Sequence, residues 1–123
     1  MIRILLVDDQ PVIRHALRTL LTMEPDMTVV EEAPDGRAAV KLAQELQPDV
    51  VVMDVNMPRL DGPSAAQEMR RLTPQTAVII LSLHHDEVTR TRALAAGAAA
   101  FIEKLAASMS TLMAAIRQAA QPA

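Results

Sequence analysis

Residues 50–54 read Val-Val-Val-Met-Asp, a short apolar run that ends in an aspartate. The run is hydrophobic without alternation, which is typical of a strand covered on both faces in a parallel sheet. Three further apolar runs end near polar residues: residues 4–7 before Asp8 and Asp9, residues 78–81 before Ser82, and residues 101–102 shortly before Lys104. Parallel strands of an alternating β/α chain end at one edge of the sheet, so these polar side chains are expected to converge there.

Helical periodicity fills the intervals between the apolar runs, so strand and helix alternate along the whole chain. Pro11 suits the first turn of a helix, Asp35 and Asp86 are candidate N-caps, and Gly97 is a candidate helix terminator. The predicted strands are residues 2–8, 27–33, 50–54, 77–82 and 99–102, and the predicted helices are residues 11–23, 36–47, 63–72, 87–96 and 108–121. This alternation predicts a doubly wound α/β sandwich with right-handed crossovers, although periodicity alone leaves the strand order open.

Length and composition predict one domain over residues 1–123. The chain has no cysteine, which excludes disulfides, zinc–thiolate sites and thiol catalysis. Its net charge is −3 and it has no basic run, so direct nucleic-acid binding by this domain is not supported. No apolar run reaches the length of a membrane helix, and the first residues leave no room for a signal peptide, so a cytoplasmic location is expected.

The predicted edge of the sheet carries an excess of negative charge. Asp8, Asp9 and Asp54 would lie close together and repel one another unless a cation is bound. Carboxylates are hard oxygen ligands, so the sequence predicts a Mg²⁺ site at these three residues.

The chain resembles the receiver domain of two-component response regulators. The resemblance covers the whole chain and is carried by Asp8-Asp9, by residues 54–58 with Asp61-Gly62, by Leu81-Ser82 and by residues 101–104. Residues 81–87 resemble the NarL/FixJ-type subfamily, whose members often carry a C-terminal helix-turn-helix. The resemblance implies a flavodoxin-like (βα)5 fold with strand order 2-1-3-4-5.

The resemblance also implies a role for each residue of the site. Asp54 would be the phosphoryl acceptor, and Mg²⁺ would be held by Asp9, Asp54 and the backbone carbonyl of Asn56, with Asp8 acting through a metal-bound water. Three further roles follow: Ser82 would hydrogen-bond the phosphoryl group, Lys104 would pair with it, and the rotamer of Phe101 would follow Ser82.

As a receiver, the chain would be a signalling domain rather than an enzyme. A sensor histidine kinase would donate the phosphoryl group, and the output surface would be residues 87–121 or the faces of residues 11–23 and 108–121. A homodimer on phosphorylation is possible, and DNA would be contacted only through a helix-turn-helix domain outside this chain, which would regulate transcription. No membrane contact is expected.

Several alternatives compete with this interpretation. A phosphatase of the haloacid dehalogenase type needs a second aspartate where this chain has Asn56. A flavodoxin-like binding protein needs a phosphate-cradling loop where residues 8–11 would repel phosphate. A stand-alone or degenerate receiver that binds partners without phosphorylation stays open.

Three features outside the motif carry smaller expectations. Leu83 follows Ser82 where a smaller residue is common, and it could narrow the approach to Asp54 and lengthen the life of the phosphorylated state. His84 and His85 are interpreted as a solvated loop pair. Arg90 and Arg92 are expected to be solvated on their helix.

Overall fold

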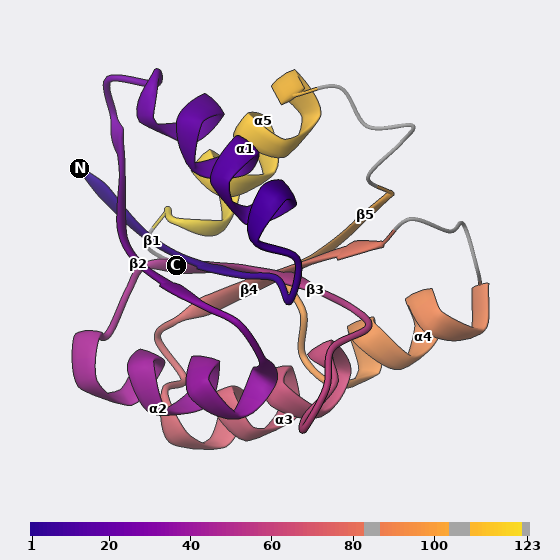
Figure 1. The fold of residues 1–123 in the computed structure, drawn as a ribbon. Coiled ribbons are helices and arrows are strands. Elements are labelled where there is room, and N and C mark those ends of the chain that lie inside the picture. Colours follow the sequence, from indigo (N-terminus) through magenta and orange to yellow (C-terminus); the bar gives the residue numbers. More distant parts are fainter. Residues whose placement is uncertain (83–86, 104–108, 122–123) are drawn as a thin grey trace.

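The computed structural model describes residues 1–82, 87–103 and 109–121, which form a parallel sheet between two layers of helices (Figure 1). The strands are β1 (Ile2–Val7), β2 (Met27–Ala33), β3 (Val50–Asp54), β4 (Ala77–Ser82) and β5 (Ala100–Glu103). The helices are α1 (Pro11–Thr22), α2 (Gly36–Leu46), α3 (Gly62–Leu72), α4 (Glu87–Ala95) and α5 (Met109–Ala119). The strand order is β2-β1-β3-β4-β5 with every pair parallel, which confirms the predicted doubly wound fold.

The two faces of the sheet are covered by different helices. Helices α1 and α5 lie on one face, and α2, α3 and α4 lie on the other (Figure 1). Val50 and Val52 of β3 belong to the core under α1 and α5, whereas Val51 and Met53 belong to the core under the other three helices. Successive side chains of a strand point to opposite faces, so burial on both faces explains the continuous apolar run of β3.

The two helical layers use side chains of different size. In α2 and α3 the buried residues include Ala39, Ala43, Ala65 and Ala66, which let these helices lie close to the sheet. Helix α5 buries larger side chains along one face: Leu112, Met113 and Ile116. None of the helices among the described residues combines the length and the apolar character needed to cross a membrane.

Helix α1 leaves some of its apolar positions exposed. Leu21 is its one fully buried residue, whereas Val12 is 81% exposed and Leu20 is 40% exposed. Val12 lies in the first turn of the helix, where its side chain faces solvent. Helical periodicity marks the apolar positions of α1 but does not show which of them the neighbouring elements cover.

Most of the predicted boundaries hold within one or two residues. The last strand was predicted at residues 99–102 and runs from Ala100 to Glu103, because its limits follow its pairing with β4. Helix α3 starts at Gly62 because the side chain of Asp61 caps it. The predicted cap Asp86 and the predicted helix start Ser108 lie outside the described residues.

Candidate functional site: an acidic cluster at the carboxyl edge of the sheet

The register of β1 and β3 brings the predicted carboxylates together. Val7 of β1 pairs with Met53 of β3, so the next residues, Asp8 and Asp54, leave neighbouring strands at the same level. Carboxylate oxygens of Asp8, Asp9 and Asp54 lie within 4.8 Å of one another. Asp8 is buried, Asp54 is half-buried and Asp9 is exposed, so the cluster opens to solvent on one side. The predicted convergence of these three residues is confirmed.

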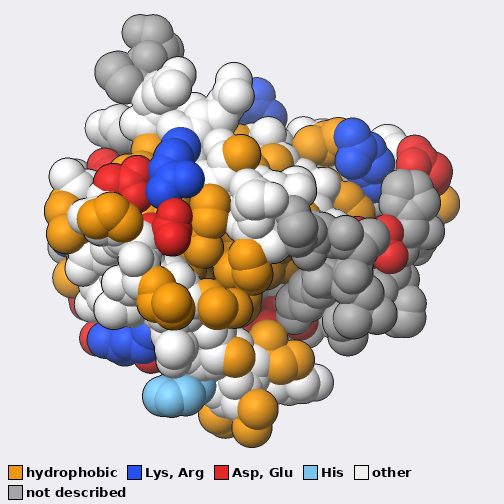
Figure 2. Space-filling view, turned by 90° about the horizontal axis from the view of Figure 1, so that it is seen from above, with side chains coloured by type: hydrophobic (Ala, Val, Ile, Leu, Met, Phe, Trp, Pro, Cys, Tyr) orange, Lys and Arg blue, Asp and Glu red, His pale blue; other side chains and the backbone are white. Residues whose placement is uncertain are grey.

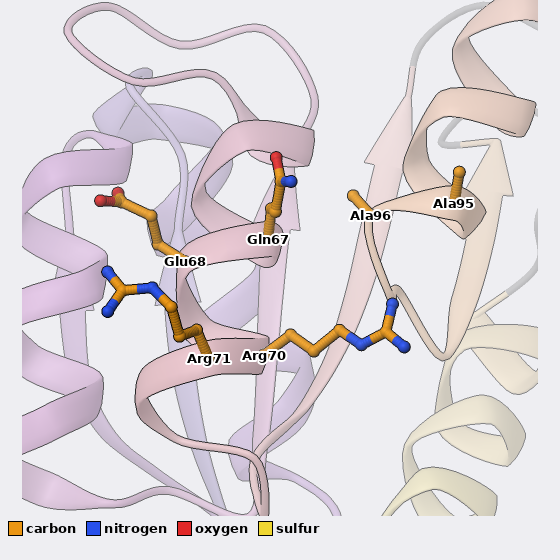
Figure 3. Close-up of a pocket in the computed structure, with 6 residues that line it drawn as sticks. All are labelled: Gln67, Glu68, Arg70, Arg71, Ala95 and Ala96. Carbon is orange, nitrogen blue, oxygen red and sulfur yellow. The ribbon is translucent and has the colours of Figure 1, made fainter.

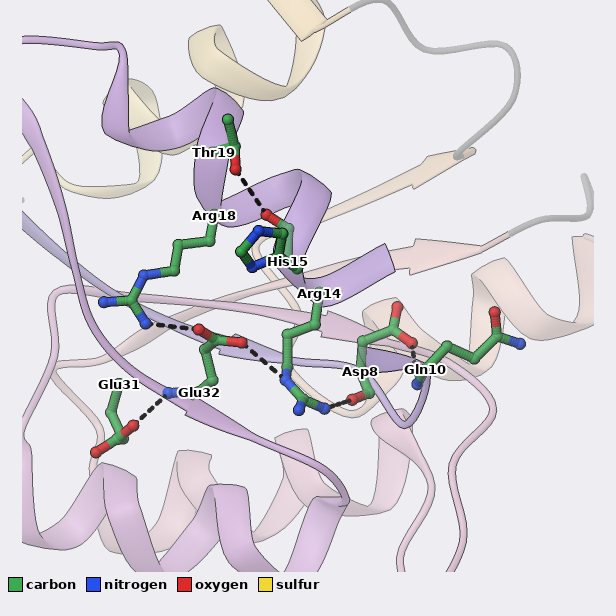
Figure 4. A network of polar contacts seen from close by, with 8 residues as sticks. All are labelled: Asp8, Gln10, Arg14, His15, Arg18, Thr19, Glu31 and Glu32. Atoms are coloured by element: carbon green, nitrogen blue, oxygen red, sulfur yellow. Dashed lines mark hydrogen bonds and ion pairs between the residues drawn. The ribbon is translucent and has the colours of Figure 1, made fainter. Parts of the chain in front are cut away.

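The turn that carries Asp8 and Asp9 is held by backbone contacts and by α1 (Figure 4). The carboxylate of Asp8 accepts a hydrogen bond from the backbone N–H of Gln10 at 2.9 Å, and the Arg14 guanidinium donates to the Asp8 carbonyl at 2.7 Å. Arg14 also donates to Glu32 of β2 at 2.9 Å. Hydrogen bonds from Arg18 and Arg14 outweigh partial burial and lower the pKa of Glu32, so this anchor stays ionised at neutral pH.

Ser82 is placed beside the cluster by the next strand pair. Asp54 pairs with Leu81 of β4, so Ser82 lies one residue further along the edge of the sheet, and it is 2% exposed. Phe101 of β5 pairs with Ile80, and it is also buried. Because residues two apart on a strand share a face, Ser82, Ile80 and Phe101 lie on the same face of the sheet. Ser82 and Phe101 therefore share a face, and the coupling of the Phe101 rotamer to Ser82 stays a prediction, while Lys104 lies outside the described residues.

The loop between β3 and α3, residues 55–61, closes back onto the end of β3. The N–H of Gly62 donates to the carbonyl of Val55 at 2.9 Å, and the N–H of Val55 donates to the carbonyl of Leu81 at 3.0 Å. A Cβ atom at Gly62 would lie 2.5 Å from the carbonyl oxygen of Asp54, so only glycine allows this approach. Asn56 is exposed and lies two residues after Asp54, the last residue of β3.

Two ion pairs connect this loop to neighbouring helices, and sequence reasoning missed both. Arg59 donates to Asp35, the N-cap of α2, at 2.6 Å, and Arg92 of α4 donates to Asp61, the N-cap of α3, at 3.0 Å. The Arg92 side chain is 54% exposed, as expected of a solvated residue, and it also forms this ion pair. The cap at Asp61 could have been found from the sequence, since aspartate is a favoured N-cap residue and the proline at position 63 suits the first turn of a helix.

Both capping carboxylates have a depressed pKa. A hydrogen bond from the Ala38 N–H, supported by Arg59, outweighs burial and lowers the pKa of Asp35. Burial opposes ionisation of Asp61, but hydrogen bonds from Ser64 and Arg92 outweigh it and lower its pKa. Both groups are therefore anions at neutral pH and can hold their arginine partners.

The donor atoms of the cluster suit a divalent cation with a preference for oxygen. Three carboxylates within 4.8 Å of one another concentrate negative charge that a bound cation would neutralise. Mg²⁺ takes oxygen ligands and binds through one or two carboxylates with its remaining positions left to water and substrate, which a cluster open on one side permits. The residues present therefore fit a Mg²⁺ site.

Residues 4–117 match the family model of the response regulator receiver domain. The chain belongs to this family. It is 37% identical over 103 residues to the transcriptional regulatory protein DegU of Brevibacillus brevis, covering 84% of this chain and 44% of that protein. It is 35% identical over 101 residues to the nitrate/nitrite response regulator protein NarL of Escherichia coli, covering 82% of this chain and 47% of that protein. The chain therefore spans less than half the length of these two relatives.

Solved structures agree with the family. The signal receiver domain of the response regulator NarL from Mycobacterium tuberculosis superposes with a TM-score of 0.90 at 31% identity, covering 98% of each chain. The response regulator domain of Thermotoga maritima CheB superposes with a TM-score of 0.84 at 36% identity, covering 99% of each chain. These likenesses confirm the predicted NarL-type receiver, a signalling domain, and they argue against the phosphatase and flavodoxin-like alternatives.

Proposed function

We propose that Asp54 accepts a phosphoryl group from a phosphohistidine of a sensor histidine kinase, in a reaction that needs Mg²⁺. The observation that carries this proposal is the cluster of Asp8, Asp9 and Asp54 within 4.8 Å at the carboxyl edge of the sheet, with Ser82 on the adjacent strand. In an open α/β sheet this edge is where ligands bind.

Asp54 acts as the nucleophile of the transfer. Its carboxylate oxygen forms a bond to phosphorus while the bond between phosphorus and the histidine nitrogen breaks, and the electron pair leaves with the imidazole. Asp8, Asp9 and the backbone carbonyl of Asn56, together with Asp54, would hold Mg²⁺. When bound, Mg²⁺ supplies positive charge that offsets the charge of the phosphoryl oxygens.

The phosphoryl group on Asp54 is expected to change the contacts of three residues: Ser82, Lys104 and Phe101. The hydroxyl of Ser82 donates a hydrogen bond to a phosphoryl oxygen, and the ammonium of Lys104 pairs with another. Phe101 lies on the same face of the sheet as Ser82, one strand further out, so a movement of Ser82 changes the space available to the ring. The acceptor site is thereby coupled to the surface of α4, β5 and α5.

The output requires a surface that a partner can recognise. Hydrophobic side chains gather over α1 and α5 (Figure 2), where Met23 is 72% exposed and Leu20 is 40% exposed. A groove of about 350 Å³ runs between the two helices and is lined by Leu20, Met23, Met109 and Met113 among others. This face favours dimerisation on phosphorylation, in a cytoplasmic regulator that acts on transcription through a DNA-binding domain outside this chain.

An alternative function is a partner-binding module that works without phosphorylation. The two functions differ in whether the acidic cluster takes up a phosphoryl group at all, so a direct chemical test separates them.

Incubation with acetyl phosphate and Mg²⁺, followed by intact mass measurement, tests the acceptor. The wild-type protein is expected to gain one phosphoryl group, and Asp54→Asn is expected to gain none, because an amide cannot form the acyl phosphate. Asp49→Asn is the matched control, since Asp49 lies at the opposite edge of the sheet and accepts a hydrogen bond from the Arg3 N–H. Equal uptake by wild type and Asp54→Asn would place the acceptor elsewhere, and no uptake by either would favour the phosphorylation-independent module.

A further inference from the structure

We propose that Arg59 and Arg92 are positioning residues that hold the loop of residues 55–61 against the acceptor from both sides, through Asp35 on α2 and Asp61 at the start of α3. We call this pair of ion pairs the loop clasp. The inference rests on the proposed function, because its consequence is a preformed Mg²⁺ site at Asp54 and the Asn56 carbonyl.

On the α2 side, the loop is bound to a buried carboxylate. The side chain of Asp35 is 5% exposed, and it accepts from Arg59 at 2.6 Å and from the Ala38 N–H at 2.8 Å. A Cβ atom at Gly36 would lie 2.0 Å from the carbonyl oxygen of Leu60, so the loop also touches the first turn of α2 directly. The loop and the helix therefore cannot separate without breaking an ion pair and a close backbone contact.

Arg59 adopts a backbone conformation that is unfavourable for its residue type. Its φ angle is +68°, in the left-handed region that residues with a side chain seldom occupy. Such a conformation persists when surrounding contacts compensate for it. The ion pair to Asp35 is the side-chain contact that does so, although the Arg59 side chain is otherwise 72% exposed.

On the α4 side, one arginine bridges two helices. Arg92 donates to Asp61 at 3.0 Å and to the hydroxyl of Ser64 at 3.2 Å, while Asp61 accepts from the Ser64 N–H at 2.8 Å. A groove between α3 and α4 is lined by short side chains, Ala95 and Ala96, on the α4 side (Figure 3). Arg92 thus adds a polar contact between α4 and the loop beside the core contact of the buried Ala93.

A displacement of the loop of residues 55–61 would also move the end of β3, which carries the acceptor Asp54. Gly62 follows Asp61, and its N–H donates to the Val55 carbonyl at 2.9 Å. The backbone of Gly62 also lies so close to the Asp54 carbonyl that a side chain would not fit between them. A shift of Asp61 toward α4 would therefore move the backbone next to Asp54 and Asn56. The loop clasp thus ties α2, α3 and α4 to the position of a predicted metal ligand.

The test compares Arg59→Gln, Arg92→Gln and the double variant with Arg37→Gln. Arg37 forms an ion pair with Glu68 at 3.4 Å, between α2 and α3, and serves as the control for loss of a surface ion pair away from the loop. Two readouts are independent of phosphoryl transfer: Mg²⁺ affinity by calorimetry, and hydrogen exchange of the Gly62 amide.

We expect each clasp variant to weaken Mg²⁺ affinity by about two- to fivefold, because partly exposed ion pairs contribute modestly. We also expect the Gly62 amide to exchange faster while the amides of β1 do not, and Arg37→Gln to match wild type. Arg92→Lys should recover part of the affinity, and added salt should reduce the difference between wild type and the glutamine variants.

Unchanged Mg²⁺ affinity and Gly62 exchange in the double variant would overturn the proposal. Faster exchange of β1 and Gly62 to the same extent would also overturn it, since the ion pairs would then stabilise the whole fold rather than the loop. A wild-type protein that binds Mg²⁺ but takes up no phosphoryl group would refute the proposed function and leave these two readouts interpretable.

Discussion

Three aspartates at the carboxyl edge of the sheet lie close to one another, whereas the acidic side chains at the amino edge lie beside arginines. At the amino edge, Arg117 donates to Glu24 at 2.7 Å and to Asp26 at 2.8 Å, and Asp49 accepts from the Arg3 N–H at 2.8 Å. At the carboxyl edge, Asp8, Asp9 and Asp54 gather against one another.

Acidic residues are therefore expected to have different roles at the amino edge and in the cluster at the carboxyl edge. A carboxylate beside an arginine favours the folded state, whereas several carboxylates close together repel one another, and a bound divalent cation lowers that repulsion. Loss of a carboxylate at the amino edge should lower stability, and loss of one at the carboxyl edge should remove ligand binding instead. The difference indicates that the carboxyl edge is shaped for binding and the amino edge for stability.

The largest expected effect is stabilisation of the carboxyl edge by Mg²⁺. At a concentration of one hundred times its dissociation constant, Mg²⁺ should raise the free energy of unfolding by about 2.7 kcal/mol, because it binds the native state. Asp9→Asn should lose most of this rise and should not lower stability in the absence of Mg²⁺. Asp26→Asn, the control at the amino edge, should lower stability slightly and keep the full rise. Thermal melts with and without Mg²⁺ measure both, and a full rise in Asp9→Asn would contradict the ligand assignment.

The next largest effect is expected from removing a buried hydrogen bond at the amino edge of the sheet. The hydroxyl of Thr76, which is 9% exposed, donates to the carbonyl of Pro48 at 2.9 Å and ties the start of β4 to the start of β3. Thr76→Val keeps the volume but removes the donor, so it should lower the free energy of unfolding by about 1–2 kcal/mol. Phosphoryl uptake from acetyl phosphate should be unchanged.

Thr19→Val is the control for this change, since the hydroxyl of Thr19 bonds within exposed α1 to the His15 carbonyl. That variant should stay within about 0.5 kcal/mol of wild type in urea unfolding. An equal loss in both variants would mean that the cost reflects valine rather than the buried bond.

The smallest expected effect is a loss of folding stability at low pH. The hydrogen bond from Arg117 lowers the pKa of Asp26 below its ordinary value of 3.8, so this group contributes stability above the unfolded pKa and loses it as pH falls through the folded pKa. Stability should thus be level near neutral pH and decrease below about pH 4. Asp26→Asn should make that decrease shallower, as measured by urea unfolding at several pH values. An identical slope in the variant would show that the Arg117 contact contributes nothing in solution.

Particular elements show how far the sequence could predict the fold. Helix and strand positions follow from periodicities of local origin, so all five strands and all five helices were found. The exposed Val12 and the shifted β5 were not predicted, because both depend on the neighbouring elements. The strand order was implied by the family resemblance, since no periodic pattern specifies which strands are neighbours.

The sequence by itself determined that Asp8, Asp9, Asp54 and Ser82 would meet, because each follows a strand and parallel strands end at a common edge. Only the tertiary structure decided the loop clasp. Arg59 and Asp35 are 24 residues apart, and Arg92 and Asp61 are 31 residues apart. Arg92 has the spacing and polarity of a solvated helix residue, and its partner is set by the distance between α3 and α4. Periodicity reports which face of an element is apolar, whereas the partner of a charged side chain depends on how the elements pack.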